Sequence, residues 1–148
     1  MSGDLPHAVL FACTQNAIRS PMAAGLMKHF YGHSVYVASC GVKPAEADPF
    51  VKVVMEEIGI DIGKHRPQGF DDLEDSSFDT VISLSPEAHH RALEMTRTMA
   101  IAAEYWPTLD PTAVQGSREQ ILDSYRAVRD GLMKRIRQRF GVHAASGV

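Results

Sequence analysis

The chain has 148 residues, of which 45% are hydrophobic, and a formal net charge of −3 at pH 7. We therefore expect one domain over residues 1–148 with one sizeable core, and the small negative charge argues against nucleic acid as a partner. Two cysteines, no membrane-length apolar run and no signal-peptide pattern favour a cytoplasmic protein with neither a disulfide framework nor a membrane partner.

Strand-like and helix-like segments alternate along the chain. Short apolar runs predict strands at residues 8–12, 35–38, 80–84 and 101–106. A capping side chain followed by proline predicts helix starts at Ser20-Pro21, Asp48-Pro49 and Ser85-Pro86. This alternation predicts an α/β fold in which a parallel sheet has helices on both faces, forming a three-layer sandwich.

The C-terminal part of the chain has the pattern of a long amphipathic helix. Ser117 and Gln120 have the spacing of a capping box, and apolar residues then recur every three to four positions. Basic residues near the end of this helix are interpreted as a solvated face; they are Lys134, Arg135, Arg137 and Arg139. We expect residues 141–148 to form a disordered tail.

The segment from Cys13 to Ser20 joins the first predicted strand to the first predicted helix. A cysteine and an arginine with five residues between them suit cleavage of a phosphate ester by a thiolate. The backbone N–H groups of the turn and the helix N-terminus would bind the oxyanion, and Arg19 would contact two of its oxygens. Cys13 would be the nucleophile, with Ser20 donating a hydrogen bond to it. The predicted substrate-binding residues are Thr14, Gln15, Asn16, Ala17, Ile18 and Ser20.

Each of these residues also has an ordinary structural explanation. A cysteine after a strand is usually a small core residue, and an arginine at a helix start is usually a solvated charge. Asn16 suits the left-handed backbone of a tight anion loop but is also common in ordinary loops. The joint occurrence of Cys13 and Arg19 at this spacing favours the catalytic interpretation.

These features and others along the chain resemble the low-molecular-weight protein tyrosine phosphatase family, including its arsenate reductase branch. Besides Cys13–Ser20 they are Val37-Ala38-Ser39, residues 57–61 before His65-Arg66, residues 78–82, Trp106 and Asp110-Pro111. The resemblance implies a four-stranded parallel sheet of order 2-1-3-4, with Cys13 at the switch point where such sheets bind ligands. It also implies that Asn16 supports the loop through Ser39.

Asp110 is the predicted general acid. It precedes Pro111 in a loop after the fourth strand, at the same edge of a parallel sheet as Cys13. The family's general acid is likewise an Asp-Pro in a late loop, and Asp110 is its nearest match. Asp-Pro is also a common turn or helix start, which leaves a structural role open.

Some positions depart from the family's pattern. Gln15 stands where the family usually has glycine, and Ile18 where it often has a second cysteine. Thr112 and Ala113 follow the Asp-Pro in place of the family's tyrosines, and residues 41–47 lack the aromatic side chain that often contacts the substrate ring. These departures affect loop flexibility and recognition of the leaving group.

The sequence is compatible with three functions. The first is a phosphomonoester hydrolase, a protein tyrosine phosphatase acting through a phosphocysteine on phosphotyrosine proteins or small aryl phosphates. The second is an arsenate reductase of the same fold, in which Cys13 attacks arsenate and a thiol relay follows, although Ser83 and Ser85 stand near the relay positions. The third is a non-catalytic module that binds phosphate.

Cys40 is the other cysteine of the chain and the remaining candidate for a relay. It follows the second predicted strand, near the same edge as Cys13. We expect a small buried residue rather than a relay partner, and negligible thioredoxin-driven arsenate turnover. We expect no cofactor. We also expect no metal site, because the adjacent His89 and His90 diverge on a helix and have no ligand set at metal spacing.

Overall fold

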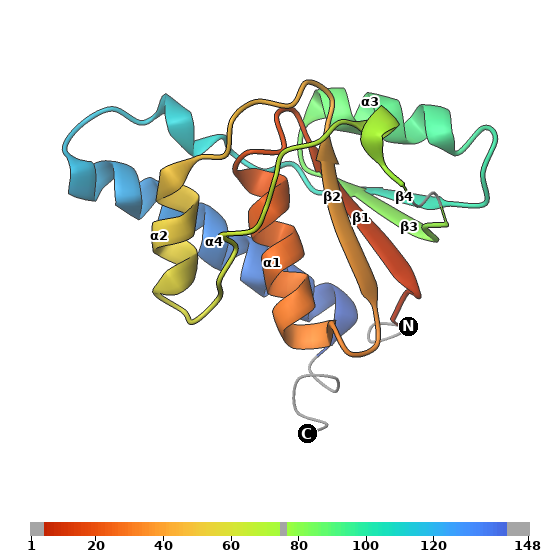
Figure 1. Ribbon diagram of the computed structural model, residues 1–148, viewed down its shortest axis with the longest axis horizontal. Helices are drawn as coiled ribbons and strands as arrows, with labels where there is room; N and C mark the ends of the chain where they lie inside the picture. The colour runs from red at the N-terminus through yellow and green to blue at the C-terminus, as the bar shows by residue number, and fades with distance from the viewer. Residues whose placement is uncertain (1–4, 75–76, 142–148) are drawn as a thin grey trace.

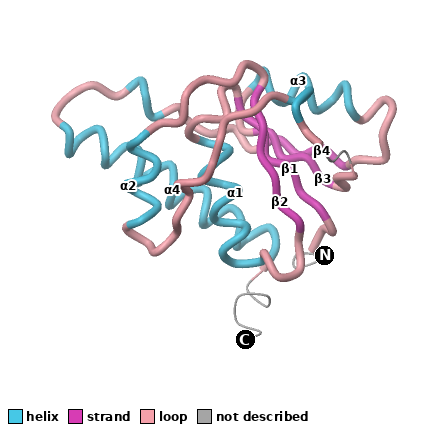
Figure 2. Tube along the Cα trace, viewed as in Figure 1, coloured by secondary structure: helices cyan, strands magenta, loops and turns pink. Residues whose placement is uncertain are grey.

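The computed structural model describes residues 5–74 and 77–141, so the predicted tail lies, beyond Gly141, outside the described residues. Within those residues strands and helices alternate (Figures 1 and 2). The strands are β1 (Ala8–Cys13), β2 (Tyr36–Gly41), β3 (Thr80–Ser83) and β4 (Ala102–Tyr105). The α-helices are α1 (Arg19–Tyr31), α2 (Pro49–Glu56), α3 (Pro86–Met95) and α4 (Arg118–Phe140). Two short 3₁₀ helices are η1 (Phe70–Asp72) and η2 (Pro111–Ala113).

The four strands form one parallel sheet in the order β2-β1-β3-β4, which confirms the predicted order. Strand β1 lies between two neighbours and is buried along its whole length. Its continuous apolar sequence follows from this position, because a central strand of a covered parallel sheet meets side chains on both faces.

Helices cover both faces of the sheet, as predicted. Val9, Phe11 and Cys13 of β1 belong to a core cluster formed with α1, α2 and α4. Leu10 and Ala12 belong to a second cluster formed with α3. Since successive strand residues point to opposite faces, this alternation produces the three layers visible in Figure 1.

Three of the four predicted helix starts are confirmed. Asp48 accepts a hydrogen bond from Phe50 N at the start of α2, and Ser85 accepts one from Ala88 N at the start of α3. Ser117 and Gln120 form the expected capping box at the start of α4.

The prediction that Ser20 caps α1 is wrong. The helix begins at Arg19, and Ile18 occupies the N-cap position without a side-chain hydrogen bond. Ser20 therefore lies inside the first turn, where its hydroxyl bonds to the loop instead of to the helix backbone. Cys13 and Asn16, in the segment before the helix, are therefore the partners of the hydroxyl that was expected to cap α1.

Strand β2 extends further than predicted. It runs to Gly41, so Ser39 and Cys40 lie inside the strand rather than after it. The extension pairs Cys40 with Ala12 and Gly41 with Cys13. Pairing with the end of β1 therefore continues the strand through residues whose types alone do not favour a strand.

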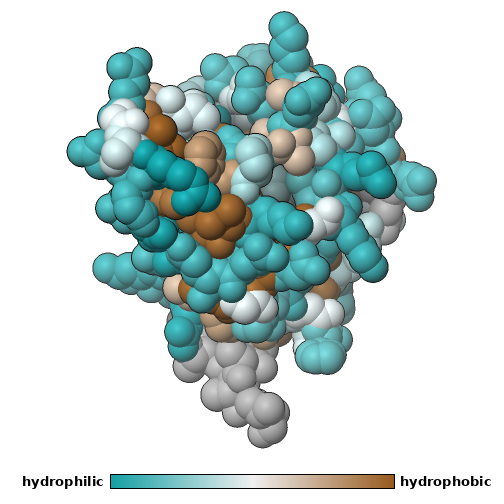
Figure 3. All heavy atoms as spheres, turned by 60° about the vertical axis from the view of Figure 1, so that its left-hand side comes forward, coloured by the Kyte–Doolittle hydropathy of each residue, from teal (hydrophilic) through white to brown (hydrophobic). Residues whose placement is uncertain are grey.

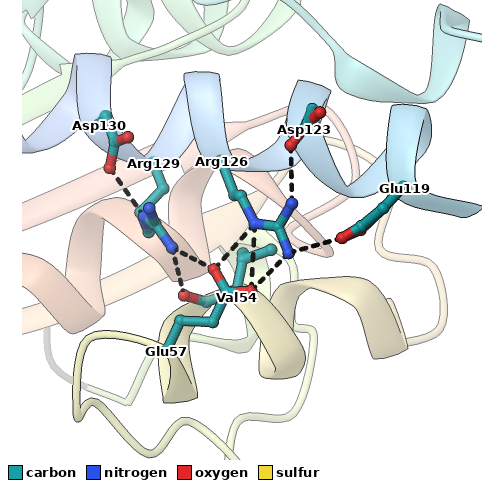
Figure 4. A network of polar contacts seen from close by, with 7 residues as sticks. All are labelled: Val54, Glu57, Glu119, Asp123, Arg126, Arg129 and Asp130. Carbon is teal, nitrogen blue, oxygen red and sulfur yellow. Dashed lines mark hydrogen bonds and ion pairs between the residues drawn. The ribbon is translucent and has the colours of Figure 1, made fainter.

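An ion-pair network fixes α2 against α4 (Figure 4). Glu57, just after α2, accepts hydrogen bonds from Arg126 and from the buried Arg129 of α4. Arg129 also donates to the carbonyl of Val54, at 2.8 Å. Hydrogen bonds from Arg126 are the main cause that lowers the pKa of Glu57 to about 2. The helix pair is thus held by charge as well as by apolar packing.

The surface that comes forward in Figure 3 is mostly hydrophilic, with a hydrophobic patch among the polar side chains. Within residues 5–74 and 77–141, no helix has both the length and the apolar character needed to cross a membrane.

Candidate active site

Residues 13–20 form a loop between the carboxyl end of β1 and the start of α1. Cys13 is the last residue of β1 and is 2% exposed. The strand order reverses beside β1, because β2 lies on one side of it and β3 on the other. Ligands of open α/β sheets bind at such a point, beyond the carboxyl ends of the strands.

The first four carbonyl groups of this loop point outward and bond to neighbouring segments. The pairs are Cys13 O with Val42 N at 3.1 Å, Thr14 O with Lys43 N at 2.8 Å, Gln15 O with Ala45 N at 3.1 Å, and Asn16 O with His65 Nε2 at 2.8 Å. A peptide unit's C=O and the following N–H point in opposite directions. The N–H groups of residues 14–17 are therefore directed toward the inside of the loop.

The inner side of the loop is suited to an anion. Asn16 N lies 3.3 Å from the sulfur of Cys13. In the described part of the chain, the N–H groups of Gln15, Ala17 and Ile18 have no protein acceptor. Together with the N-terminus of α1, these groups form a concave set of donors of the kind that binds phosphate.

Gly41 allows β2 to approach the loop closely. A Cβ atom at this position would lie 2.7 Å from Asn16 N and 2.9 Å from Thr14 O. Both are backbone atoms of the anion loop, so a larger residue would displace the loop itself. The end of β2 thus requires glycine here for steric reasons.

Asn16 holds the shape of the loop. Its φ of 54° lies in the left-handed region, and its side chain is fully buried. The side-chain amide donates to Ser20 Oγ at 2.8 Å and to Ser39 Oγ at 2.9 Å, so the Asn16–Ser39 contact implied by the resemblance is present. Its oxygen accepts from Gln68 N at 2.9 Å. All polar atoms of the side chain are therefore engaged in fixing the loop.

Ser20 bonds to the sulfur of Cys13. The distance between Ser20 Oγ and Cys13 Sγ is 2.9 Å. Asn16 already donates to the same hydroxyl oxygen, which leaves the hydroxyl proton for another acceptor. The Cys40 carbonyl is a more distant acceptor, at 3.4 Å, so Cys13 is the better placed one.

Arg19 connects the anion loop to the loop after β4. Its Nη1 donates to the carbonyl of Thr108 at 3.0 Å. Asp110 lies two residues beyond Thr108 and precedes η2. The two loops that carry the predicted catalytic residues therefore meet at the carboxyl edge of the sheet.

Asp110 is held by Thr112. One carboxylate oxygen accepts from Thr112 N at 3.0 Å and from Thr112 Oγ1 at 2.7 Å. Burial raises the pKa of Asp110, but the hydrogen bonds from Thr112 and the charge of Arg19 together lower it below the ordinary value. The carboxyl group is thus oriented by Thr112, the residue that stands in place of a family tyrosine.

The side chains of the other predicted binding residues point away from the anion position or into the core. Thr14 Oγ1 donates to Ser85 Oγ and to Glu87 Oε1 at the start of α3, at 3.0 and 3.1 Å. Ala17 and Ile18 are buried in the core, whereas Gln15 is exposed. These residues therefore offer an anion their backbone groups rather than their side chains.

Cys40 lies in a different environment from Cys13. It is fully buried in the cluster formed with α3, on the opposite face of the sheet. Burial raises the pKa of Cys40 far above its ordinary value. The expectation of a small buried residue is confirmed, and a Cys13–Cys40 disulfide would require backbone movement because the side chains leave the sheet on opposite sides.

Sequence reasoning did not assign roles to three residues that contact the site. His65 bonds to Asn16 O, and burial lowers the pKa of this histidine. Gln68 and Thr108 contact Asn16 and Arg19 through backbone atoms, which leave no side-chain signal in a sequence. For His65, its place beside Arg66 within the family resemblance was the available signal.

Within residues 5–74 and 77–141, no group of three or more histidine, cysteine, aspartate or glutamate side chains lies close enough to hold a metal ion.

The chain is similar to known proteins over most of its length. The family described as low molecular weight phosphotyrosine protein phosphatase matches residues 8–143. Arsenate reductase of Bacillus subtilis (strain 168) is 30% identical over 130 residues, which cover 88% of this chain and 92% of the relative. Glutaredoxin arsenate reductase of Synechocystis sp. is 31% identical over 128 residues, covering 86% and 92%. The structure of an arsenate reductase in the phosphate binding state matches with a TM-score of 0.69 at 29% identity, covering 87% of this chain and 92% of that chain.

Proposed function

The chain belongs to the low molecular weight phosphotyrosine protein phosphatase family, and on that premise we propose that Cys13 attacks a tetrahedral oxyanion bound in the loop of residues 13–20. The proposal rests on one observation above all, the inward N–H groups of this loop around the sulfur of Cys13. These donors and Arg19 would neutralise the charge of the oxyanion, and Ser20 would stabilise the thiolate. The residues present serve hydrolysis of a phosphate monoester best.

Hydrolysis takes two steps. In the first, the thiolate of Cys13 forms a bond to phosphorus as the bond to the leaving oxygen breaks, and Asp110 gives that oxygen a proton. In the second, Asp110 takes a proton from water, and the water oxygen attacks phosphorus and frees the thiolate. Arg19 would swing from Thr108 O to the phosphate oxygens. Both steps use only groups of this site and water.

The substrate proposed is an aryl phosphate, phosphotyrosine in a protein included. The sulfur of Cys13 is nearly inaccessible from the surface, so a long, flat leaving group reaches it better than a short alkyl one. Equal kcat/KM for phosphotyrosine and phosphoserine peptides would contradict this preference. The proposed location of the enzyme is the cytoplasm, where both cysteines stay reduced.

The role of Asp110 is tested with leaving groups of different basicity. Asp110→Asn should lower kcat/KM about 10²–10⁴-fold for a phenyl phosphate whose phenol is a poor leaving group. The loss should nearly disappear with dinitrophenyl phosphate, whose phenolate needs no proton. A loss of the same size across the series would instead assign Asp110 to loop structure, as its hydrogen bonds with Thr112 would allow.

Arsenate reduction is the second candidate, and the names of the relatives favour it over phosphatase activity. Cys13 would attack arsenate and displace water. A second thiol would then form a disulfide with Cys13, and the electron pair of the sulfur–arsenic bond would leave with arsenic as arsenite. Another thiol would reduce that disulfide. Since Cys40 faces the other side of the sheet, both thiols would come from outside the chain.

A side-by-side assay separates the candidates. The wild type is supplied with an aryl phosphate in one reaction, and with arsenate and either glutathione or thioredoxin in the other. Hydrolysis of the aryl phosphate with negligible thioredoxin-driven arsenate turnover is expected. Sustained arsenite production with an external thiol, at a rate above ester hydrolysis, would make reduction the main activity. Phosphate binding without either turnover would leave a binding module.

A further inference from the structure

A groove separates the loop after β4 from helix α4. Its volume is about 670 Å³, and residues 106–111, 113 and 114 form one wall. The other wall is α4, from Ser124 to Gln138. The groove lies outside the anion loop, and the chemistry described above does not use most of its lining.

Small residues form the α4 side of the groove. Ser124, Ala127 and Gly131 lie three and four positions apart, on one face of the helix. A Cβ atom on Gly131 would meet nothing within 4 Å, so packing does not require glycine there. Glycine inside a helix costs roughly 0.5–1 kcal/mol relative to alanine. The helix therefore has a destabilising residue at a position that lines the groove, where the missing side chain leaves room for a ligand.

Two apolar side chains of the opposite wall are exposed to solvent. Leu109 is 84% exposed and Val114 is 42% exposed. Both lie in the lining of the groove, across from the small residues of α4. Large apolar side chains held at this exposure, next to a groove, favour contact with an apolar group of another molecule.

The groove borders the candidate active site. Thr108 and Asp110 belong to its lining, and Thr108 accepts the hydrogen bond of Arg19. A chain entering the groove would therefore begin beside the phosphate bound in the anion loop. The helical wall from Ser124 to Gln138 is about 21 Å long at 1.5 Å per residue, which matches about six residues of extended peptide.

The charge of the lining changes along the groove. Asp110 is the acidic residue at the active-site end, and Lys134 and Arg135 are the basic residues on the later turns of α4. Arg135 lies over the ring of Trp106, 5.1 Å from its centroid, which holds its charge at the groove. An acidic side chain would be favoured beside these two residues and disfavoured beside Asp110.

We propose that this groove binds the peptide segment next to the phosphorylated residue of a protein substrate. An apolar side chain of that segment packs against Leu109, Val114 and Gly131, and an acidic side chain beyond it pairs with Lys134 and Arg135. The inference rests on the proposed phosphatase function and adds a substrate class, namely phosphoproteins with an apolar and then an acidic residue beside the phosphorylated position.

The first test fills the groove. Gly131→Leu is compared with the wild type on two phosphotyrosine peptides. Each carries leucine about three residues and glutamate about five residues from the phosphotyrosine, on its N-terminal side in one peptide and on its C-terminal side in the other. The measured quantity is kcat/KM for the peptide divided by kcat/KM for p-nitrophenyl phosphate. We expect this ratio to fall about tenfold. An unchanged ratio for both versions of the peptide would overturn the proposal.

The second test reverses a charge. Lys134→Glu should lower the same ratio about fivefold for the glutamate peptide and leave the ratio for a glutamine peptide unchanged. Arg118→Glu, the same charge change on α4 outside the groove, is the matched control and should alter neither ratio. Equal effects of Lys134→Glu and Arg118→Glu would show a general effect of net charge and would contradict a specific site.

A binding measurement separates failure of the groove from failure of the proposed phosphatase activity. Fluorescence anisotropy gives Kd of the labelled glutamate phosphopeptide for Cys13→Ser and for the Cys13→Ser/Gly131→Leu double variant. A weaker Kd in the double variant supports the groove even if the wild type hydrolyses no ester. If the two variants have equal Kd values and the wild type hydrolyses the ester, the groove proposal is rejected while the proposed phosphatase function stands. A wild-type dimer that Gly131→Leu dissociates, seen by sedimentation, would assign the groove to a second copy and overturn the proposal.

Discussion

The two cysteines lie one residue apart in the register of neighbouring strands, yet their surroundings differ in almost every respect. Cys13 ends β1 at the edge of the sheet, beside a hydroxyl and a backbone N–H group. Cys40 lies within β2 on the α3 face, among apolar side chains and fully buried. These surroundings predict a reactive thiol at Cys13 and an inert one at Cys40, although the two residues lie close together.

Replacing each cysteine in turn should produce the largest difference between the two positions. Cys13→Ser should lower kcat about 10⁴-fold or more, because the proposed nucleophile is lost. Cys40→Ala should keep activity within about twofold and lower the free energy of unfolding by about 1 kcal/mol, as expected for a small cavity. Steady-state rates and denaturant unfolding measure both effects. Phosphate-induced thermal stabilisation of Cys13→Ser serves as the folding control. Substantial turnover by Cys13→Ser would refute the mechanism.

Two buried serines give a second comparison between the faces. Ser20→Ala removes the hydroxyl beside Cys13 and should lower kcat about 10–100-fold, the value of a hydrogen bond to a charged group. Ser83 pairs with Ala12 in register, and its buried hydroxyl has no partner among the described residues. Ser83→Ala should therefore leave kcat unchanged and unfolding nearly so. A similar loss of kcat in both variants would indicate a packing effect.

The layer of helices on the Cys13 face depends on Glu57. Glu57→Gln should lower the free energy of unfolding by about 1–2 kcal/mol at pH 7, between the values for exposed and buried ion pairs. Because the folded-state pKa of Glu57 is lowered from 4.5 to about 2, its contribution is complete above pH 4.5 and is lost as the pH falls toward 2. Urea unfolding at pH 7 and pH 3 should therefore show a smaller difference at the lower pH.

The exposed Asp71–Arg91 pair provides the control on the α3 face. These groups are 3.6 Å apart, and the Asp71 side chain is 96% exposed. Asp71→Asn should change the free energy of unfolding very little at either pH. A change in the free energy of unfolding as large as that of Glu57→Gln would show that ion pairs stabilise the two helical layers equally.

The smallest effect is expected at Thr112. Thr112→Val removes the hydroxyl bond to Asp110 but keeps the backbone one and the shape of the side chain. Since the hydroxyl stabilises the carboxylate, its loss should raise the pKa of Asp110. The basic limb of the profile of kcat/KM against pH should then move to higher pH, measured with a phenyl ester of a poor leaving group. A shift to lower pH would contradict the role of Asp110 as the acid.

Local signals in the sequence were sufficient to predict the helices and strands, but not always the residues at which they begin and end. The caps at Asp48, Ser85 and Ser117 were predictable because each uses a short-range hydrogen bond. Ser20 has the same residue pattern, but its hydroxyl bonds to Cys13 and Asn16 instead. Tertiary partners therefore override the local preference where the anion loop is built.

The site shows the same division between local and long-range information. Cys13 and Arg19 were predictable because their spacing is set within one turn. Contacts through backbone atoms, such as those of Gln68 and Thr108, depend on the packing of distant segments and leave no residue type to detect. The extension of β2 to Gly41 likewise depends on its pairing with β1.

The outward carbonyls of the anion loop have a consequence for how this protein tolerates change. Gln15, where the family usually has glycine, has no positive φ, and its side chain is exposed. The donors for an anion at this position come from the main chain, whose direction is fixed by the segment of residues 42–45. Binding of an oxyanion would therefore depend on main-chain atoms and not on the exposed side chain of Gln15. A substitution at residue 15 should accordingly leave the direction of these main-chain donors unchanged.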